Sequence, residues 1–229
     1  MAQKCSTGGV PNENLTKKGK YMKAFIFCGG EVFPQYINEK REDSDLVIAA
    51  DSGYRNAQSL GFPVDILVGD FDSLGDIPDG VGEVVRLPAE KDMTDTQYAV
   101  DLAIKRGASE LVIVASTSGR FDHALSLTAI LEDLWEKKVR GTIVNGQNRI
   151  TFLKNTNHIL VRNNNYKYFS LIAADDKVKG VSVEGAKYPL RNKTLTRRVQ
   201  FAVSNEIVKN AALITVKKGG VYIIESRDI

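Results

Sequence analysis

The sequence predicts an α/β domain built on a parallel sheet, followed by an all-β sandwich domain. In the first two-thirds of the 229-residue chain, short apolar runs alternate with helical patterns, which is typical of strands joined by crossover helices. After residue 147 the helical patterns stop, and short β-rich runs follow one another between turn residues. We therefore expect a flexible extension over residues 1–21, the α/β domain over 22–147 and the β-sandwich domain over 148–229.

The elements of the α/β domain are predicted from two periodicities. Apolar runs closed by Gly or Asp are typical of buried parallel strands, which we expect at 24–28, 46–50, 66–68, 84–87, 111–115 and 142–144. Apolar residues at helical spacing, followed by Gly107 and Gly141, predict helices over 94–106 and 122–137.

The β-sandwich domain is predicted from runs of β-forming residues. We expect strands at 151–153, 158–161, 168–173, 178–183, 197–203, 213–216 and 221–224, with turns at 163–165, 174–176, 184–185 and 218–220.

Composition and charge exclude several classes of protein. The formal net charge of +3 is too small and too dispersed to indicate nucleic-acid binding. We expect no membrane span, because no run approaches the length of about 20 apolar residues that a membrane helix needs. The two cysteines, Cys5 and Cys28, have neither metal-ligand nor disulfide spacing, so we expect a reducing compartment, the cytoplasm.

Carboxylates stand where two predicted strands end. Asp51 follows the run 46–50, and Asp70 and Asp72 follow the run 66–68. Ligand sites of open α/β sheets lie beyond these strand ends. If the backbone stays extended, Asp70 and Asp72 share a side, where Mg²⁺ and a polyphosphate would relieve their repulsion. The alternative is a polar turn.

Two further clusters precede the predicted helices. Thr94 and Asp95 suit the first turn of the helix 94–106, either as a cap or as part of a phosphate site at the helix N-terminus. Before the second helix stand hydroxyls, a glycine and a guanidinium that can bind phosphate through two hydrogen bonds, or form a surface ion pair. The residues of this third cluster are Ser116, Thr117, Ser118, Gly119, Arg120, Asp122 and His123. The chain has no GxxxxGK[ST], GxGxxG or GxSxG motif after a strand.

The ordered set of clusters resembles the signature of the thiamine pyrophosphokinase family. The clusters in order are 51–53, 69–73, 91–95 and 119–123, and segments 185–190 and 203–206 resemble the family's C-terminal motifs. The resemblance runs from about residue 23 to near the C-terminus. It implies an α/β nucleotide-binding domain and a β-sandwich, a homodimer with thiamine at the subunit interface, and transfer of diphosphate from ATP to thiamine with Mg²⁺.

The resemblance also implies roles for individual residues. Asp70, Asp72, Asp95 and Asp122 resemble the catalytic acids around Mg²⁺ and the polyphosphate, with Asp51 close by. Ser204 and Asn205 match the segment that faces thiamine. The residues implied to contact the nucleotide are Lys91, Thr94, Ser116, Thr117, Ser118, Gly119 and Arg120. Two of these depart from the family pattern: Ser118 replaces a glycine, and Lys91 replaces a neutral polar residue.

Two other functions compete with this one. Asp70-Phe71-Asp72 also resembles the motif of haloacid-dehalogenase phosphatases, in which the first Asp is the nucleophile. Leu74 in the Thr/Val position and the motif's place on the third strand count against it. The third hypothesis is a nucleotide-sensing or interaction module without activity, whose acids only cap helices.

Overall fold

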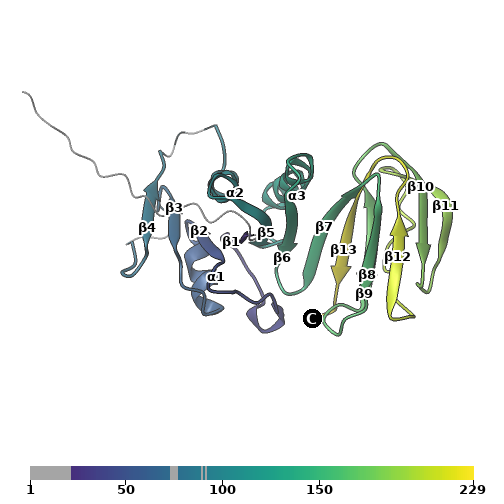
Figure 1. The fold of residues 1–229 in the computed structure, drawn as a ribbon, viewed down its shortest axis with the longest axis horizontal. Helices are drawn as coiled ribbons and strands as arrows, with labels where there is room; N and C mark the ends of the chain where they lie inside the picture. Colours follow the sequence, from purple (N-terminus) through teal and green to yellow (C-terminus); the bar gives the residue numbers. More distant parts are fainter. Residues whose placement is uncertain (1–21, 73–76, 89, 91) are drawn as a thin grey trace, which may run out of the picture.

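The structure, a computed structural model of the chain, describes residues 22–72, 77–88, 90 and 92–229. The predicted extension 1–21 and Lys91 lie outside the described residues. Two sheets and three α-helices make up the described part (Figure 1). No helix in these ranges has the length and apolar character needed to cross a membrane.

The first sheet begins with six parallel strands in the order β4-β3-β2-β1-β5-β6. They are β1 (Met22–Phe27), β2 (Leu46–Ala50), β3 (Ile66–Gly69), β4 (Glu83–Arg86), β5 (Ala108–Val114) and β6 (Arg140–Val144). Strand β1 lies near the centre, so chain order runs outwards in both directions from it. This arrangement creates a topological switch point between β1 and β5.

Helices cover both faces of the parallel strands. Helices α2 (Asp95–Lys105) and α3 (Phe121–Glu136) lie on one face, and the short α1 (Gly53–Ser59) and the 3-10 turn η1 (Pro34–Tyr36) lie on the other (Figure 1). Side chains of β1 alternate between these layers: Ile26 packs with α2 and α3, whereas Phe25 and Phe27 pack on the α1 side. Burial on both faces explains the unbroken apolar run of this strand.

The same sheet continues past residue 147 with antiparallel strands. Strand β6 pairs with β7 (Asn148–Lys154), which is followed by β13 (Gly220–Ser226) and β9 (Tyr168–Ala173). A second sheet, β11-β10-β12-β8, packs on this part: β8 (Asn157–Val161), β10 (Lys177–Glu184), β11 (Leu190–Thr196) and β12 (Ala211–Thr215). Apolar residues of both sheets, including Leu171, Ile223, Val181 and Ile214, form the core between them.

The predicted fold class, a parallel-sheet α/β unit followed by a β-sandwich, is confirmed. The two units do not have separate sheets. The proposed division at residue 147 lies in the turn between β6 and β7, inside one continuous nine-stranded sheet. The two units therefore share a backbone hydrogen-bond network, not merely a linker.

Two elements differ from the sequence-based prediction. The strand expected at 197–203 is wrong; the strand is β11, Leu190–Thr196. Because β11 is an edge strand with mostly exposed side chains, it lacks apolar alternation. The apolar residues that suggested the later strand, Val199, Phe201 and Val203, are exposed. Helix α1 was not expected, since it buries only Gly53 and Ala57 and has no apolar stripe.

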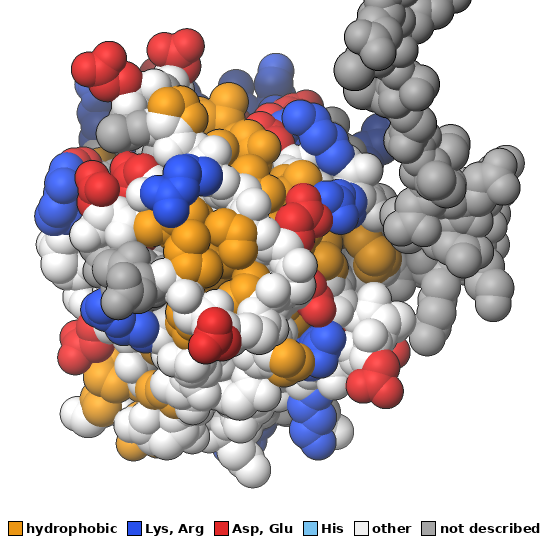
Figure 2. All heavy atoms as spheres, turned by 90° about the vertical axis from the view of Figure 1, so that its left-hand side faces the viewer, with side chains coloured by type: hydrophobic (Ala, Val, Ile, Leu, Met, Phe, Trp, Pro, Cys, Tyr) orange, Lys and Arg blue, Asp and Glu red, His pale blue; other side chains and the backbone are white. Residues whose placement is uncertain are grey.

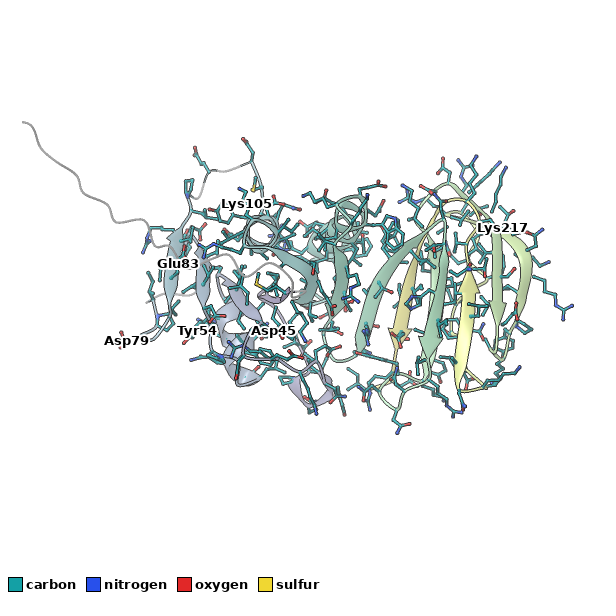
Figure 3. All side chains as sticks on the ribbon, in the orientation of Figure 1. Asp45, Tyr54, Asp79, Glu83, Lys105 and Lys217 are labelled. Atoms are coloured by element: carbon teal, nitrogen blue, oxygen red, sulfur yellow. The ribbon has the colours of Figure 1, made fainter. Side chains whose placement is uncertain are left out.

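An exposed ion pair lies at the outer edge of the parallel sheet. Arg106, the C-cap of α2, approaches Glu83 of β4 to 2.9 Å. Glu83 is labelled in Figure 3. On this side of the molecule, acidic and basic side chains are scattered around an apolar surface (Figure 2). Ile77 and Val84 belong to the exposed apolar residues of this edge.

Candidate active site

A cleft of about 740 Å³ lies at the carboxyl ends of β1, β2 and β5. This is the switch point of the sheet, and the volume suits a small-molecule ligand. Its lining includes seven of the predicted site residues: Asp51, Thr94, Asp95, Ser116, Ser118, Gly119 and Arg120.

Glycines allow the strand ends to approach each other around the cleft. A Cβ atom on Gly30 would stand 2.6 Å from the Cβ atom of Ser116, and one on Gly29 would stand 2.3 Å from Oγ of Ser52. Gly30 also has a φ of 91°, which side-chain-bearing residues rarely adopt. The Gly29-Gly30 pair therefore brings the ends of β1, β2 and β5 together.

Asp51 lies beside the turn that carries Asp70. Its backbone N–H donates to the Val68 carbonyl over 2.8 Å. A Cβ atom on Gly69 would stand 3.2 Å from the Asp51 Cβ atom. The carboxyl ends of β2 and β3 therefore meet here, next to the cleft.

The backbone is not extended through Asp70–Asp72, so that condition of the sequence argument is wrong. Phe71 has a φ of 69° and its side chain is buried in the core on the α1 side. The Asp72 N–H donates to Oδ1 of Asp70 over 3.2 Å, which closes a tight turn. The two acids are thus neighbours through this turn. Asp70 and Asp72 are not among the residues that line the cleft.

The N-terminus of α2 points its first turn at the cleft. Oγ1 of Thr94 accepts the Gln97 N–H over 3.1 Å, which is an N-cap hydrogen bond. Asp95 is the acid of the first helical turn, and both residues line the cleft. Thr94 thus has a structural role whether or not it also contacts a ligand.

The loop after β5 holds a hydroxyl pair and an ion pair. Oγ of Ser116 accepts the Ser118 N–H over 3.2 Å, which shapes the loop. Nη2 of Arg120 lies 2.6 Å from Oδ2 of Asp122, and both side chains are well exposed, at 74% and 62%. The hydrogen bond from Arg120 lowers the pKa of the Asp122 carboxyl below its usual range. Asp122 is therefore a weak proton acceptor while this pair is intact.

Two predicted residues of the third cluster do not line the cleft. Asp122 reaches it only through its ion pair with Arg120. Oγ1 of Thr117 accepts hydrogen bonds from the side-chain amides of Asn145 at 2.9 Å and Asn148 at 3.2 Å. Thr117 thus ties the loop after β5 to the turn between β6 and β7.

Ser204 and Asn205 lie in the sandwich and not in the cleft lining. Ser204 is exposed, with a φ of 53°, and its N–H donates to Oγ of Ser170 over 3.0 Å. Asn205 is buried. Its Oδ1 accepts the N–H groups of Tyr188 and Glu206, and its Nδ2 donates to the Tyr188 carbonyl. Asn205 therefore positions the segment around Ser204, and Ser204 is the member that is open to a ligand.

The acids near the cleft are side chains of the type that binds magnesium ions. Among the described residues, no group of three or more His, Cys, Asp or Glu is arranged to hold a metal. Mg²⁺ typically binds one or two carboxylates together with phosphates and water. Asp70 and Asp72 are two carboxylates in one turn.

Several cleft residues were not predicted as site residues. They are Cys28, Gly29, Gly30, Glu31, Ser52, Thr96, Ser126 and Leu127. Gly29 and Gly30 could have been predicted as cleft residues, since two glycines directly follow a buried strand. Thr96 and Ser126 could not have been predicted from the sequence, because each is brought to the cleft by the packing of its helix.

Cys28 lies in the floor of the cleft as a protonated thiol. Burial raises the pKa of Cys28 to about 11, while a hydrogen bond from Oγ1 of Thr96 has a smaller effect in the opposite direction. A raised pKa keeps the thiol neutral up to that pH, and the thiol is much less nucleophilic than the thiolate.

Alkylation of Cys28 is expected to be slow at neutral pH. In a Cys5→Ser variant, iodoacetamide should modify the folded protein at pH 8 at a small fraction of the rate seen in 8 M urea, because burial suppresses both thiolate formation and access. Mass spectrometry of the time course measures both rates. Equal rates in the two conditions would show that Cys28 is accessible and ionised.

Comparison with known proteins adds two family assignments. The model described as "Thiamin pyrophosphokinase, catalytic domain" matches residues 37–143. The model described as "Thiamin pyrophosphokinase, vitamin B1 binding domain" matches residues 156–221.

Individual relatives agree with these matches. The thiamine pyrophosphokinase of Bacillus subtilis is 27% identical over 193 residues, which are 82% of this chain and 90% of the relative. Crystal structures of that protein and of its Geobacillus thermodenitrificans counterpart have TM-scores of 0.80 and 0.76, with 24% and 25% identity. They cover 91% and 90% of this chain, and 100% and 98% of theirs. The fold extends to the Candida albicans enzyme, with a TM-score of 0.70, 16% identity and 90% coverage of both chains.

Proposed function

Because the chain belongs to the thiamine pyrophosphokinase family, we propose that its cleft transfers diphosphate from ATP to the hydroxyl of thiamine. The products are thiamine diphosphate and AMP. The observation that carries the location is the convergence of Asp51, Asp95 and the loop 116–120 on one cleft at the switch point of the sheet.

The chemistry requires positioning and charge neutralisation. The thiamine hydroxyl oxygen forms a bond to the β-phosphorus, and the bond between that phosphorus and the oxygen bridging to the α-phosphate breaks. The electron pair leaves with AMP, and the hydroxyl proton passes to a base. Reactions of this type depend mainly on alignment and on stabilising negative charge.

Asp70 and Asp72 are proposed as metal ligands, supported by their closeness in the turn after β3. Mg²⁺ bound there would screen the charge of the β- and γ-phosphates. Asp95 is the proposed proton acceptor. Asp122 suits that role less well, because Arg120 lowers its pKa and occupies its carboxylate. Its proposed role is to orient Arg120 and complete the metal's surroundings once substrate is bound.

The nucleotide is proposed to bind along the loop 116–120. Arg120 is exposed, so its guanidinium can exchange its contact with Asp122 for phosphate oxygens. Ser116, Ser118 and the flexible Gly119 supply hydroxyl and backbone N–H donors at the cleft. Thr94 and Thr117 support this site through the helix cap and the β6–β7 turn, and Lys91 is proposed as a phosphate contact on the family resemblance alone.

Thiamine is proposed to bind between two subunits, with Ser204 reaching the cleft of the partner. The exposed apolar side chains Phe201, Val203 and Tyr188 near Ser204 support a homodimer, since such groups are favoured at interfaces. The separate ranges of the two family models, 37–143 and 156–221, support a division into domains at residue 147. The free thiol of Cys28 supports a cytoplasmic location.

Substitutions at Ser204 and Asn205 should have different effects. Ser204→Ala is expected to raise KM for thiamine several-fold and leave the urea midpoint unchanged. Asn205→Ala is expected to lower the free energy of unfolding by about 1–3 kcal/mol, because it removes the three part-buried hydrogen bonds that the Asn205 side chain makes with backbone groups of Tyr188 and Glu206. Urea titration and steady-state kinetics measure both. An unchanged KM in Ser204→Ala would contradict the proposed thiamine contact.

The proposed function is tested by incubating the protein with ATP, Mg²⁺ and thiamine and separating the products. Thiamine diphosphate and AMP in equal amounts are the expected result. Inorganic phosphate or ADP without a thiamine product would contradict it and favour a phosphatase, and binding without turnover would favour a module without activity.

A further inference from the structure

A second cavity lies where strands β6 and β7 diverge within the nine-stranded sheet. Strands β6 and β7 pair only from Thr142 to Val144 and from Arg149 to Thr151, and they separate away from their turn (Figure 1). The resulting fork groove, bounded by α3, β6, β7 and β8, has a volume of about 720 Å³, similar to that of the catalytic cleft. Its lining shares no residue with the lining of the catalytic cleft.

Helix α3 separates the two cavities. Its first turns contribute His123 and Leu127 to the catalytic cleft, whereas its last turns contribute Leu131 and Trp135 to the fork groove. The groove also contains Arg140 at the beginning of β6. It therefore extends along β6 and β7 from the residues that pair them to the amino end of β6, and it lies apart from the ATP site proposed above.

One wall of the fork groove is aromatic and aliphatic. Trp135 packs edge-on against Phe152, with ring centroids 5.9 Å apart, and Leu131 and Val139 lie beside them. This wall presents apolar surface to the cavity, of the kind that binds flat organic molecules.

The other groups of the groove carry a surplus of positive charge. The acids of the lining are already paired: Glu110 with Arg140 at 2.6 Å, and Glu136 with Lys154, which is outside the lining, at 2.6 Å. Arg149 has only a long contact of 3.8 Å with Glu225. Its Nε is buried without a hydrogen-bond partner.

His158 and Lys138 complete the polar side. Burial, with a smaller effect from Arg149, lowers the pKa of His158, so its imidazole is neutral at pH 7 and can donate or accept a hydrogen bond. No ion pair of Lys138 is found within the described residues. Arg149 and Lys138 are therefore the cations available to an anionic group.

We propose that the fork groove is a second ligand site, which takes a small aromatic or apolar molecule carrying an anionic group. The ring system lies against Trp135 and Phe152, and the anion faces Arg149 and Lys138. Apolar contact supplies affinity and the cations select the charge.

The probe for this site is 8-anilinonaphthalene-1-sulfonate, a fluorescent aromatic anion. Trp135 is the chain's only tryptophan. Energy transfer from it to the bound probe therefore reports binding, and competition by ATP distinguishes the fork groove from the catalytic cleft. The expected result is saturable binding of one probe per chain that saturating ATP with Mg²⁺ does not displace. Displacement by ATP would place the probe in the catalytic cleft and overturn the proposal.

Variants test the chemistry. Arg149→Gln is expected to weaken probe binding about tenfold and Lys138→Gln by about two- to fivefold, because one ion contact is lost in each. Lys105→Gln is the matched control, an exposed lysine at the end of α2 outside the groove (Figure 3). Unchanged affinity in both groove variants would overturn the proposed charge selection. If Arg149→Gln fails to fold, Lys138→Gln still tests the proposal.

A second copy of the chain is the other possible occupant. If the groove is covered in a dimer, Trp135 emission should change on dilution without any probe, in step with dissociation measured by sedimentation. That result would overturn the small-molecule site. Emission that is independent of protein concentration and shifts only with the probe supports it.

Discussion

Replacing Asp72 with Asn is expected to lower turnover with ATP and thiamine by about 100-fold or more. The substitution keeps the size of the side chain but removes one of the two adjacent charges proposed to hold Mg²⁺. Loss of a metal's charge stabilisation at a phosphoryl centre costs several kcal/mol of barrier height. Steady-state kinetics over a range of Mg²⁺ concentrations measures the effect, and added Mg²⁺ should rescue part of it.

The matched control is Asp79→Asn, an exposed acid elsewhere on the α/β unit (Figure 3). It should retain full turnover. Because Asp72 is exposed, both variants should unfold at the same urea concentration as the parent chain. Near-normal turnover of Asp72→Asn would rule out its role at the metal.

Gly53→Ala is expected to have the largest effect on folding, with a loss of about 3 kcal/mol or more. A Cβ atom at this position would stand 2.1 Å from the Phe27 carbonyl oxygen and 2.5 Å from its carbon. These are backbone atoms of the central strand, so no side-chain rotation relieves the overlap, and overpacking of this kind is strongly destabilising. Urea titration followed by circular dichroism measures the loss.

Gly61→Ala separates overlap from backbone strain. Gly61 has a φ of 72°, yet nothing lies within 4 Å of a Cβ atom built there. This variant should therefore lose only about 1 kcal/mol, the cost of a positive φ for alanine. If Gly53→Ala were as stable as Gly61→Ala, the prediction would be wrong, because α1 would then shift away from β1 at no cost in the free energy of unfolding.

The parallel strands and the two long helices could be predicted because their signals are local. The run 46–50 is apolar throughout, since both faces of β2 are covered. The helix 94–106 begins at the Thr94 cap and ends before Gly107, and the observed α2 is Asp95–Lys105. Edge strand β11 gave no such signal, because backbone pairing with β10 holds it without burying most of its side chains.

The carboxylate positions illustrate the same limit within the site. That Asp51 and Asp70 end neighbouring strands could be predicted from the apolar runs before them. The turn at Phe71 could not be predicted, because Phe71 combines a left-handed backbone conformation with burial of its ring in the core. Likewise the sequence indicated phosphate binding or a surface ion pair for Arg120, but it did not identify Asp122 as the partner of that ion pair.

The sequence alone was enough to predict the parallel strands, the two long helices, the places where acids follow strands, and the family motifs. All of these depend on residues close together in the chain. Only the tertiary structure showed which strand ends meet and that the Asn205 side chain hydrogen-bonds to backbone groups. It also showed that β6 and β7 diverge away from their turn. These features depend on contacts between distant segments, where packing and backbone pairing outweigh local preference.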